Sequence, residues 1–182
     1  MSVYIALLRA VNVGGTSAVR MTDLRDTLTD LGLEDVRTLL QSGNVVFRTR
    51  APAEASLERR LEEEVSRRLG VETEFFLRSD REWRGVVNGN PFPSWAKKAP
   101  NLLHGLFLKT APAASAWEAV RGAIQGPDQI EGLGRQGYIV YPEGSGRSRL
   151  TPAVLERHLG TRGTSRNWNT IRKLEGMLSG TL

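Results

Sequence analysis

The sequence contains no cysteine among its 182 residues. Disulfide bridges, thiolate metal sites and cysteine nucleophiles are therefore excluded. Histidine is scarce as well, because His104 and His158 are the only two, and a metal centre built on histidine is not expected. From this composition we predict no metal and no cofactor.

A long apolar run is also missing from the start of the chain. The first residues lack a basic n-region and a cleavage site, and the apolar stretch at residues 3–8 is too short to cross a membrane. We therefore expect a cytoplasmic protein with no membrane partner. With 40% hydrophobic residues, the chain can bury one sizeable core or two small ones.

Hydrophobic periodicity predicts the elements of residues 1–78 in the order strand, helix, strand, strand, helix, strand. Residues 3–8 have the continuous apolar pattern of a central strand. Helices are predicted from Thr22 onward and over residues 52–69, where apolar residues recur every three or four positions. Residues 41–44 contain the glycine and asparagine typical of a tight hairpin turn. This order is the ferredoxin-like βαββαβ arrangement, an antiparallel sheet with two helices on one face.

The remaining chain partly repeats this pattern. Three prolines between residues 89 and 101 predict a linker without regular structure. Residues 102–182 predict strand, helix, strand and strand, followed by two helices, the last capped by Ser165, with no fourth strand. The predicted fold class is α+β, a two-part α/β protein. It comprises a ferredoxin-like domain with a trailing helix at residues 1–88, the linker, and a related βαββ half that ends in two helices.

The net charge of +5 is concentrated near the end of the chain. Seven basic residues stand there against one acid, Glu156, which gives this window a charge of +6. Such clusters attract phosphates or nucleic acid, and a solubilising surface is the alternative interpretation. The basic residues are Arg147, Arg149, Arg157, Arg162, Arg166, Arg172 and Lys173.

The first strand runs into a glycine pair, with two polar residues placed where the strand ends. Backbone amides of such a turn can hold an anion, although the next helix begins only at Thr22, which favours a purely architectural turn. In the last helix, Arg166 and Asn169 are expected on the outer face, and Asn167 toward the apolar side, where its amide needs hydrogen-bond partners. The candidate ligand-binding residues are Arg9, Asn12, Gly14, Gly15, Asn44, Arg162, Arg166 and Asn169.

Four segments give a resemblance to a known family. They are residues 4–15 (YIALLRAVNVGG), 41–47 (QSGNVVF), 90–92 (NPF) and 165–170 (SRNWNT). Together they resemble the bacterial family known as domain of unknown function 1697, and they run in the family's order over nearly the whole chain. The resemblance implies a two-part α/β protein with ferredoxin-like topology. It implies no established activity.

Three hypotheses about function follow. The first is a binding module for an anionic ligand, a nucleotide or a nucleic-acid backbone, near the junction of the first strand-turn and the last helix. The second is a small-molecule enzyme with its site between the two halves. Its side chains stabilise charge well but are poor general bases. They would be Arg9, Asn12, Asn44 and Arg166. The third is an interaction module without a small ligand. We rank the first ahead, while enzyme and binding module both remain open.

Overall fold

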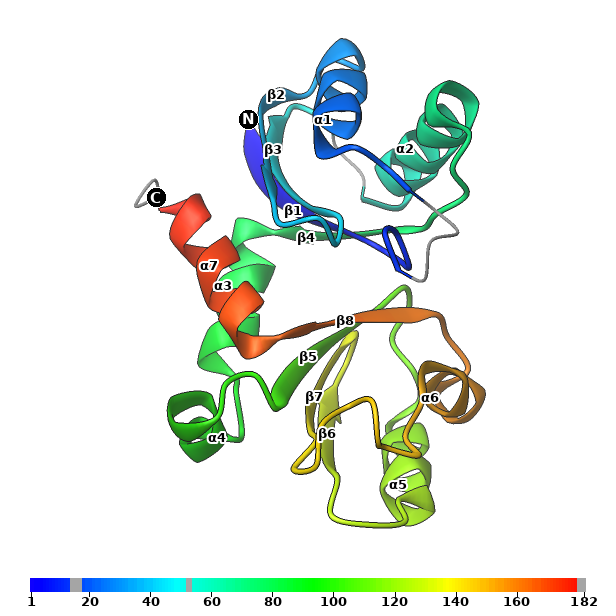
Figure 1. Cartoon of the computed structure of the whole chain (residues 1–182), viewed down its shortest axis with the longest axis vertical. Helices are drawn as coiled ribbons and strands as arrows, with labels where there is room; N and C mark the ends of the chain where they lie inside the picture. Colours follow the sequence, from blue (N-terminus) through cyan, green and yellow to red (C-terminus); the bar gives the residue numbers. More distant parts are fainter. Residues whose placement is uncertain (14–17, 52–53, 180–182) are drawn as a thin grey trace. The chain divides into compact units, whose positions relative to one another are not determined.

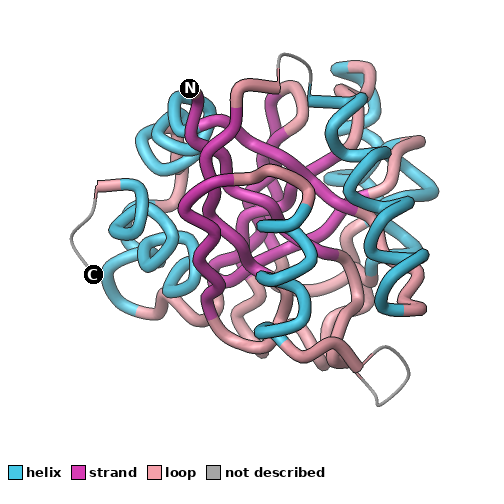
Figure 2. The backbone as a smooth tube through the Cα atoms, turned by 90° about the horizontal axis from the view of Figure 1, so that it is seen from above, coloured by secondary structure: helices cyan, strands magenta, loops and turns pink. Residues whose placement is uncertain are grey.

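The structure, a computed structural model, describes residues 1–13, 18–51 and 54–179. Its chain divides into two compact units. The first unit is Met1–Gly85 together with the chain from Leu174 onward, and the second unit is Val86–Lys173. Each unit is built on one four-stranded antiparallel sheet with helices packed against it (Figures 1 and 2). The predicted α+β class with two related halves is therefore confirmed.

The first unit has the element order predicted for residues 1–78. Its elements are β1 (Ser2–Leu8), α1 (Met21–Asp30), β2 (Glu34–Leu39), β3 (Asn44–Thr49), α2 (Glu54–Leu69) and β4 (Phe75–Ser79), followed by α3 (Asp80–Asn88). The strands lie in the order β2-β3-β1-β4, so β1 is a central strand, as its continuous apolar sequence predicted.

The core of the first unit lies between the sheet and the helix pair α1 and α2, which lie beside each other in Figure 1. Because side chains alternate along a strand, Ala6 and Leu8 of β1 point into this core, where Leu24 and Leu28 of α1 meet them. The predicted apolar stripe of α2 packs into the same cluster, with Leu61 fully buried. Burial of each such leucine stabilises the fold by about 1.5–3 kcal/mol.

The second unit repeats this order of elements. Its strands lie in the order β6-β7-β5-β8, which matches the order in the first sheet. The elements are β5 (Leu103–Leu108), α5 (Ala114–Ala123), β6 (Gln129–Leu133), β7 (Gln136–Val140), α6 (Pro152–Leu159) and β8 (Gly163–Asn167), followed by α7 (Trp168–Leu178).

The strand β8 corrects the prediction that the second half ends in helices without a fourth strand. Gly163–Asn167 pairs antiparallel with β5, with Arg166 opposite Gly105. Helix α7 therefore begins at Trp168, and the prediction that Ser165 caps it was wrong. Five residues with one glycine and no large apolar side chain give a weak strand signal. The strong helical stripe that follows led us to start the helix too early.

Backbone hydrogen bonds at the end of each central strand show how closely the two units correspond. In each unit, two N–H groups that follow one another along the chain donate to carbonyl groups of neighbouring segments, at N···O distances of 2.8 or 3.0 Å. The donor and acceptor residues are Leu8 with Gly43 and Arg9 with Glu74 in the first unit, and Leu108 with Arg135 and Lys109 with Arg162 in the second. The second unit is thus a structural repeat of the first.

The core of the second unit is organised around Trp117 of α5, which packs on the β6–β7 hairpin. The indole ring lies directly over Gly132 and Gly137, and a Cβ atom added at Gly137 would come within 2.9 Å of it. Both glycines are therefore needed for space. Helices α5 and α6 lie beside each other on this sheet (Figure 1), and their apolar side chains join the same cluster.

The proline-rich segment is more regular than predicted. Residues Pro93–Lys98 form a short helix, α4, with proline at the first helical position. Proline is well tolerated there, because the first N–H groups of a helix have no intrahelical acceptor. The prediction of no regular structure between residues 89 and 101 was therefore wrong over these six residues.

Candidate anion-binding site

Arg9 follows β1 in the first unit and forms an ion pair. Its Nη1 lies 3.4 Å from Oε2 of Glu74, and both side chains are about a quarter exposed. The main chain of Arg9 is held as well, because Thr73 Oγ1 donates to its carbonyl oxygen at 2.8 Å. A carboxylate so close to this guanidinium competes with any anionic ligand for it.

Asn12 holds two loops of the first unit together. Its Nδ2 donates to the carbonyl oxygens of Val19 at 2.9 Å and Gln41 at 2.6 Å, and its Oδ1 accepts from Val19 N at 2.8 Å. Both amide N–H donors are thereby used. Asn12 also adopts a φ of 55°, a left-handed conformation that asparagine tolerates better than most residues. These contacts give Asn12 a structural role.

Asn44 is fully buried at the beginning of β3. Its Nδ2 donates to Leu39 O and to Ser42 Oγ, both at 2.9 Å, and so closes the hairpin turn that the sequence predicted. Gly43 in this turn has a φ of 74°, and a Cβ atom there would lie 2.7 Å from Leu8. The segment QSGN is therefore explained by turn geometry. The other two candidates of this unit, Gly14 and Gly15, lie outside the described residues.

The predicted candidates of the second unit occupy different environments. Arg162 is exposed between α6 and β8, and Asn169 is exposed in the first turn of α7. Arg166 belongs to β8, which corrects its expected place on the last helix. Its Nη1 donates to Thr164 Oγ1 at 2.9 Å and to Ser165 O at 2.8 Å, and desolvation lowers the pKa of Arg166 to about 10. The guanidinium stays protonated at neutral pH.

Asn167 is the N-cap of α7. Its Oδ1 accepts from Thr170 N at 3.0 Å and from Thr170 Oγ1 at 3.1 Å. Capping satisfies backbone donors that have no partner within the helix. The hydrogen-bond partners predicted for this amide are therefore found in the helix itself.

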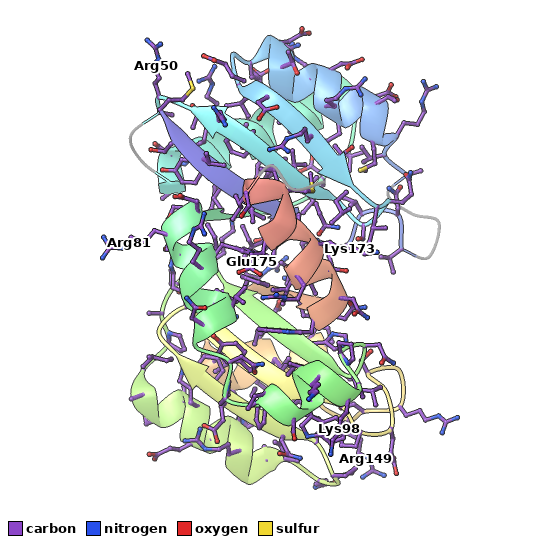
Figure 3. The ribbon with its side chains drawn as sticks, turned by 90° about the vertical axis from the view of Figure 1, so that its left-hand side faces the viewer. Arg50, Arg81, Lys98, Arg149, Lys173 and Glu175 are labelled. Atoms are coloured by element: carbon purple, nitrogen blue, oxygen red, sulfur yellow. The ribbon has the colours of Figure 1, made fainter. Side chains whose placement is uncertain are left out.

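A cavity of about 170 Å³ between α5 and α6 brings together three other basic side chains of the second unit, Arg149, Arg157 and His158. Arg149, labelled in Figure 3, comes from the segment between β7 and α6, while Arg157 and His158 belong to the last turn of α6. Cations in the last turn of a helix also complement its dipole. Their convergence with Arg149 from a separate segment defines the candidate anion site.

Hydrogen bonds and packing fix the walls of this cavity. Arg149 Nη1 donates to Gln125 Oε1 at 3.0 Å, which orients a guanidinium that has further donors. Asp128, which also lines the cavity, accepts a hydrogen bond from Ser148 Oγ. Leu150 and Val154 line the cavity and belong to the core cluster of the unit, so its base is well packed. With His158 left out of the count, the lining contains two cationic side chains, Arg149 and Arg157, and one carboxylate, Asp128.

A second recess, of about 330 Å³, adjoins this cavity. The two share Ile124 and Asp128 in their linings. The recess is bounded in addition by Phe92, which precedes α4, and by residues of β6. Arg121 and Glu131 stand at its edge as an ion pair, with Nη1 and Oε2 3.1 Å apart.

Sequence analysis identified some of the residues that line the cavity and the recess, but not their grouping. Arg149 and Arg157 were recognised in the basic window, but they were not grouped with His158. Phe92 was not a candidate residue. The grouping depends on how α5 packs against α6, and these helices are separated by a whole β-hairpin. The adjacent basic residues Arg157 and His158, in the first of the two helices predicted at the end of the chain, were the available signal.

The fold and the cavity define an α+β protein of two repeated units with a basic hollow in the second. The chain belongs to the family described as "Protein of unknown function (DUF1697)", whose model matches residues 1–138. This match confirms the predicted family membership. Arg149, Arg157 and His158 lie beyond the matched residues.

Comparison with solved structures finds the conserved bacterial protein SP0830 from Streptococcus pneumoniae. It superposes with a TM-score of 0.74 at 25% sequence identity, and the match covers 97% of this chain and 98% of that one. A comparison with curated proteins finds no match.

Two further properties concern the part of the chain that the structure describes. No helix there combines the length and apolar character needed to cross a membrane. Among the same residues, no group of three or more histidine, aspartate or glutamate side chains is arranged to hold a metal ion.

Proposed function

We propose that this protein is a binding module for a small anionic ligand, and that the second unit holds a phosphate group of this ligand between Arg149, Arg157 and His158. The cavity that these residues line is the observation that carries the proposal. The two asparagines predicted as ligand contacts in the first unit form structural hydrogen bonds, and this favours the second unit. Arg162, Arg166 and Asn169 do not line this cavity, and their role as ligand contacts stays a prediction.

The charge distribution supports this location. The second unit carries 12 Lys and Arg residues against 5 Asp and Glu residues, a net charge of +7. The first unit carries 13 against 15, a net charge of −2. A positive surface raises the local concentration of anions and their rate of association. Anions are therefore attracted to the unit that contains the cavity.

The size of the cavity favours a single phosphate group over a nucleic-acid backbone. At about 170 Å³ it is smaller than the roughly 300–1,000 Å³ typical of pockets for whole drug-sized ligands. A nucleic-acid site would instead require a stripe of cations along the surface, and affinity would fall steeply with salt over several phosphate contacts. We further propose that the protein acts in the cytoplasm.

Calorimetric titration with inorganic phosphate at low ionic strength tests this function. Replacing either arginine, in Arg149→Ala or Arg157→Ala, removes a charge-assisted hydrogen bond worth about 1.5–3 kcal/mol. The expected loss of affinity is roughly ten- to a hundredfold. Arg147→Ala is the matched control, because Arg147 is exposed nearby but does not line the cavity.

The proposal is overturned if phosphate does not bind, or if both cavity variants bind it as well as the control does. Tight binding of single-stranded or duplex nucleic acid with a steep salt dependence, undiminished in the cavity variants, also contradicts it. Each variant is first checked by circular dichroism and urea unfolding, so that loss of fold is not counted as loss of binding.

A further inference from the structure

The recess beside the phosphate cavity has the lining of a site for a flat ring. Phe92 and Ile124 are half-buried there and offer apolar surface, and the buried Ile130 belongs to the same lining. An aromatic side chain offers a ring face on which any nucleic-acid base can stack. The volume of about 330 Å³ falls within the range of roughly 300–1,000 Å³ that small-molecule sites occupy.

Polar side chains at the same recess supply hydrogen-bond acceptors. Asp128 lines both the recess and the phosphate cavity, and Gln129 and Glu131 lie at the recess on β6. Carboxylates accept hydrogen bonds from sugar hydroxyls and from exocyclic amino groups of bases. The recess therefore combines apolar surface, one aromatic ring and acceptors, whereas the cavity beside it supplies cations.

The order of these groups matches the order of groups in a nucleotide. Because the two hollows share Ile124 and Asp128, a ligand with its phosphate at Arg157 would extend past Asp128 toward Phe92. We infer that the ligand is a nucleoside monophosphate, with its phosphate in the cavity, its ribose beside Asp128 and its base against Phe92. This inference rests on the phosphate site proposed above and adds the identity of the rest of the ligand.

Three probes titrated into the full chain separate the contributions: inorganic phosphate, ribose 5-phosphate and adenosine 5′-monophosphate. All three should require Arg157. Adenosine 5′-monophosphate should bind about tenfold more tightly than ribose 5-phosphate, since stacking of one base on an aromatic ring supplies a gain of about this size. Cytidine 5′-monophosphate, tested in parallel, measures any preference for the base.

The substitution Phe92→Leu removes the ring while keeping an apolar side chain in place. It should weaken adenosine 5′-monophosphate about tenfold and leave ribose 5-phosphate unchanged. Trp95→Leu is the matched control, because Trp95 is a half-buried aromatic residue of the adjacent α4 that does not line the recess. Urea unfolding of both variants confirms that each is folded.

The outcomes distinguish this inference from the function on which it rests. If inorganic phosphate binds through Arg157 but the nucleotide binds no more tightly than ribose 5-phosphate, the inference is wrong and the phosphate site stands. A preference for the nucleotide that survives Phe92→Leu also overturns it. If no phosphate compound binds, both proposals fail.

Discussion

Asn12 shows how a single side chain can determine the position of two loops. It bonds to both backbone groups of Val19 and to the carbonyl oxygen of Gln41, while its own backbone is left-handed. The first sequence segment shared with the family and the turn segment QSGN thus meet at one residue. Their joint presence in the sequence has a structural explanation that requires no ligand.

Two substitutions separate the hydrogen bonds of Asn12 from its backbone conformation. Asn12→Gly keeps the left-handed backbone and loses the side-chain bonds, so unfolding should become easier by about 1–3 kcal/mol. Asn12→Ala adds backbone strain and should cost about 1 kcal/mol more. Urea denaturation measures both. Equal stability of wild type and Asn12→Gly would show that these bonds contribute nothing to the fold.

His104 gives the second unit a dependence of stability on pH. It lies on β5, and its ring meets that of Tyr141 edge to face, with the ring centroids 5.1 Å apart. Desolvation lowers the pKa of His104 below 6.5, and a hydrogen bond with the backbone of Asn101 opposes this only in part. The unfolded chain therefore takes up this proton at a higher pH than the native protein does.

Stability linked to His104 is complete above pH 6.5, the ordinary value for the unfolded chain, and is lost as the pH falls toward the lower native pKa. Urea unfolding of the wild type and of His104→Gln between pH 7.5 and pH 5, an interval of roughly one unit or more on either side of that value, isolates this contribution. The variant should lose less stability on acidification. A wild type that gains stability relative to the variant at the acidic end would reverse the sign and refute the assignment.

At the scale of elements, the junction of β8 and α7 shows where sequence patterns lose their predictive power. The order of the helices and strands in residues 1–78 was predicted correctly because apolar residues recur there with clear periods. Strand β8 has a buried Thr164 and an exposed Ser165, an alternation too short to stand out in the sequence. Its pairing with β5 over 50 residues away along the chain is a tertiary effect.

Asn167 ends β8 and caps α7, so its replacement tests this junction. Asn167→Ala removes the acceptor for Thr170 N and should destabilise the protein by about 0.5–2 kcal/mol. Asn167→Ser retains a side-chain acceptor suited to the cap and should recover most of that loss. Thermal and urea unfolding provide the measurement. If serine and alanine destabilise equally, the cap is not the source of the effect.

At the scale of the whole molecule, two units with the same order of strands carry net charges of opposite sign. In the first unit the backbone N–H of Arg9 donates to Glu74, and the two side chains form an ion pair. The corresponding backbone hydrogen bond of the second unit joins Lys109 to Arg162, which are both basic. Basic residues were recognised in the sequence because charge can be counted directly. The cavity itself was not predicted, because it forms only when α5 packs against α6 and brings Arg149 to His158.

The proposal that the second unit binds a phosphate group is tested most directly by amide chemical shifts of ¹⁵N-labelled protein during titration with inorganic phosphate. Shifts should concentrate at residues 125, 126, 128, 149–150 and 157–158, and should disappear in Arg157→Ala. No shift at millimolar phosphate, or shifts centred on Arg9 and Asn12 instead, would contradict the proposal.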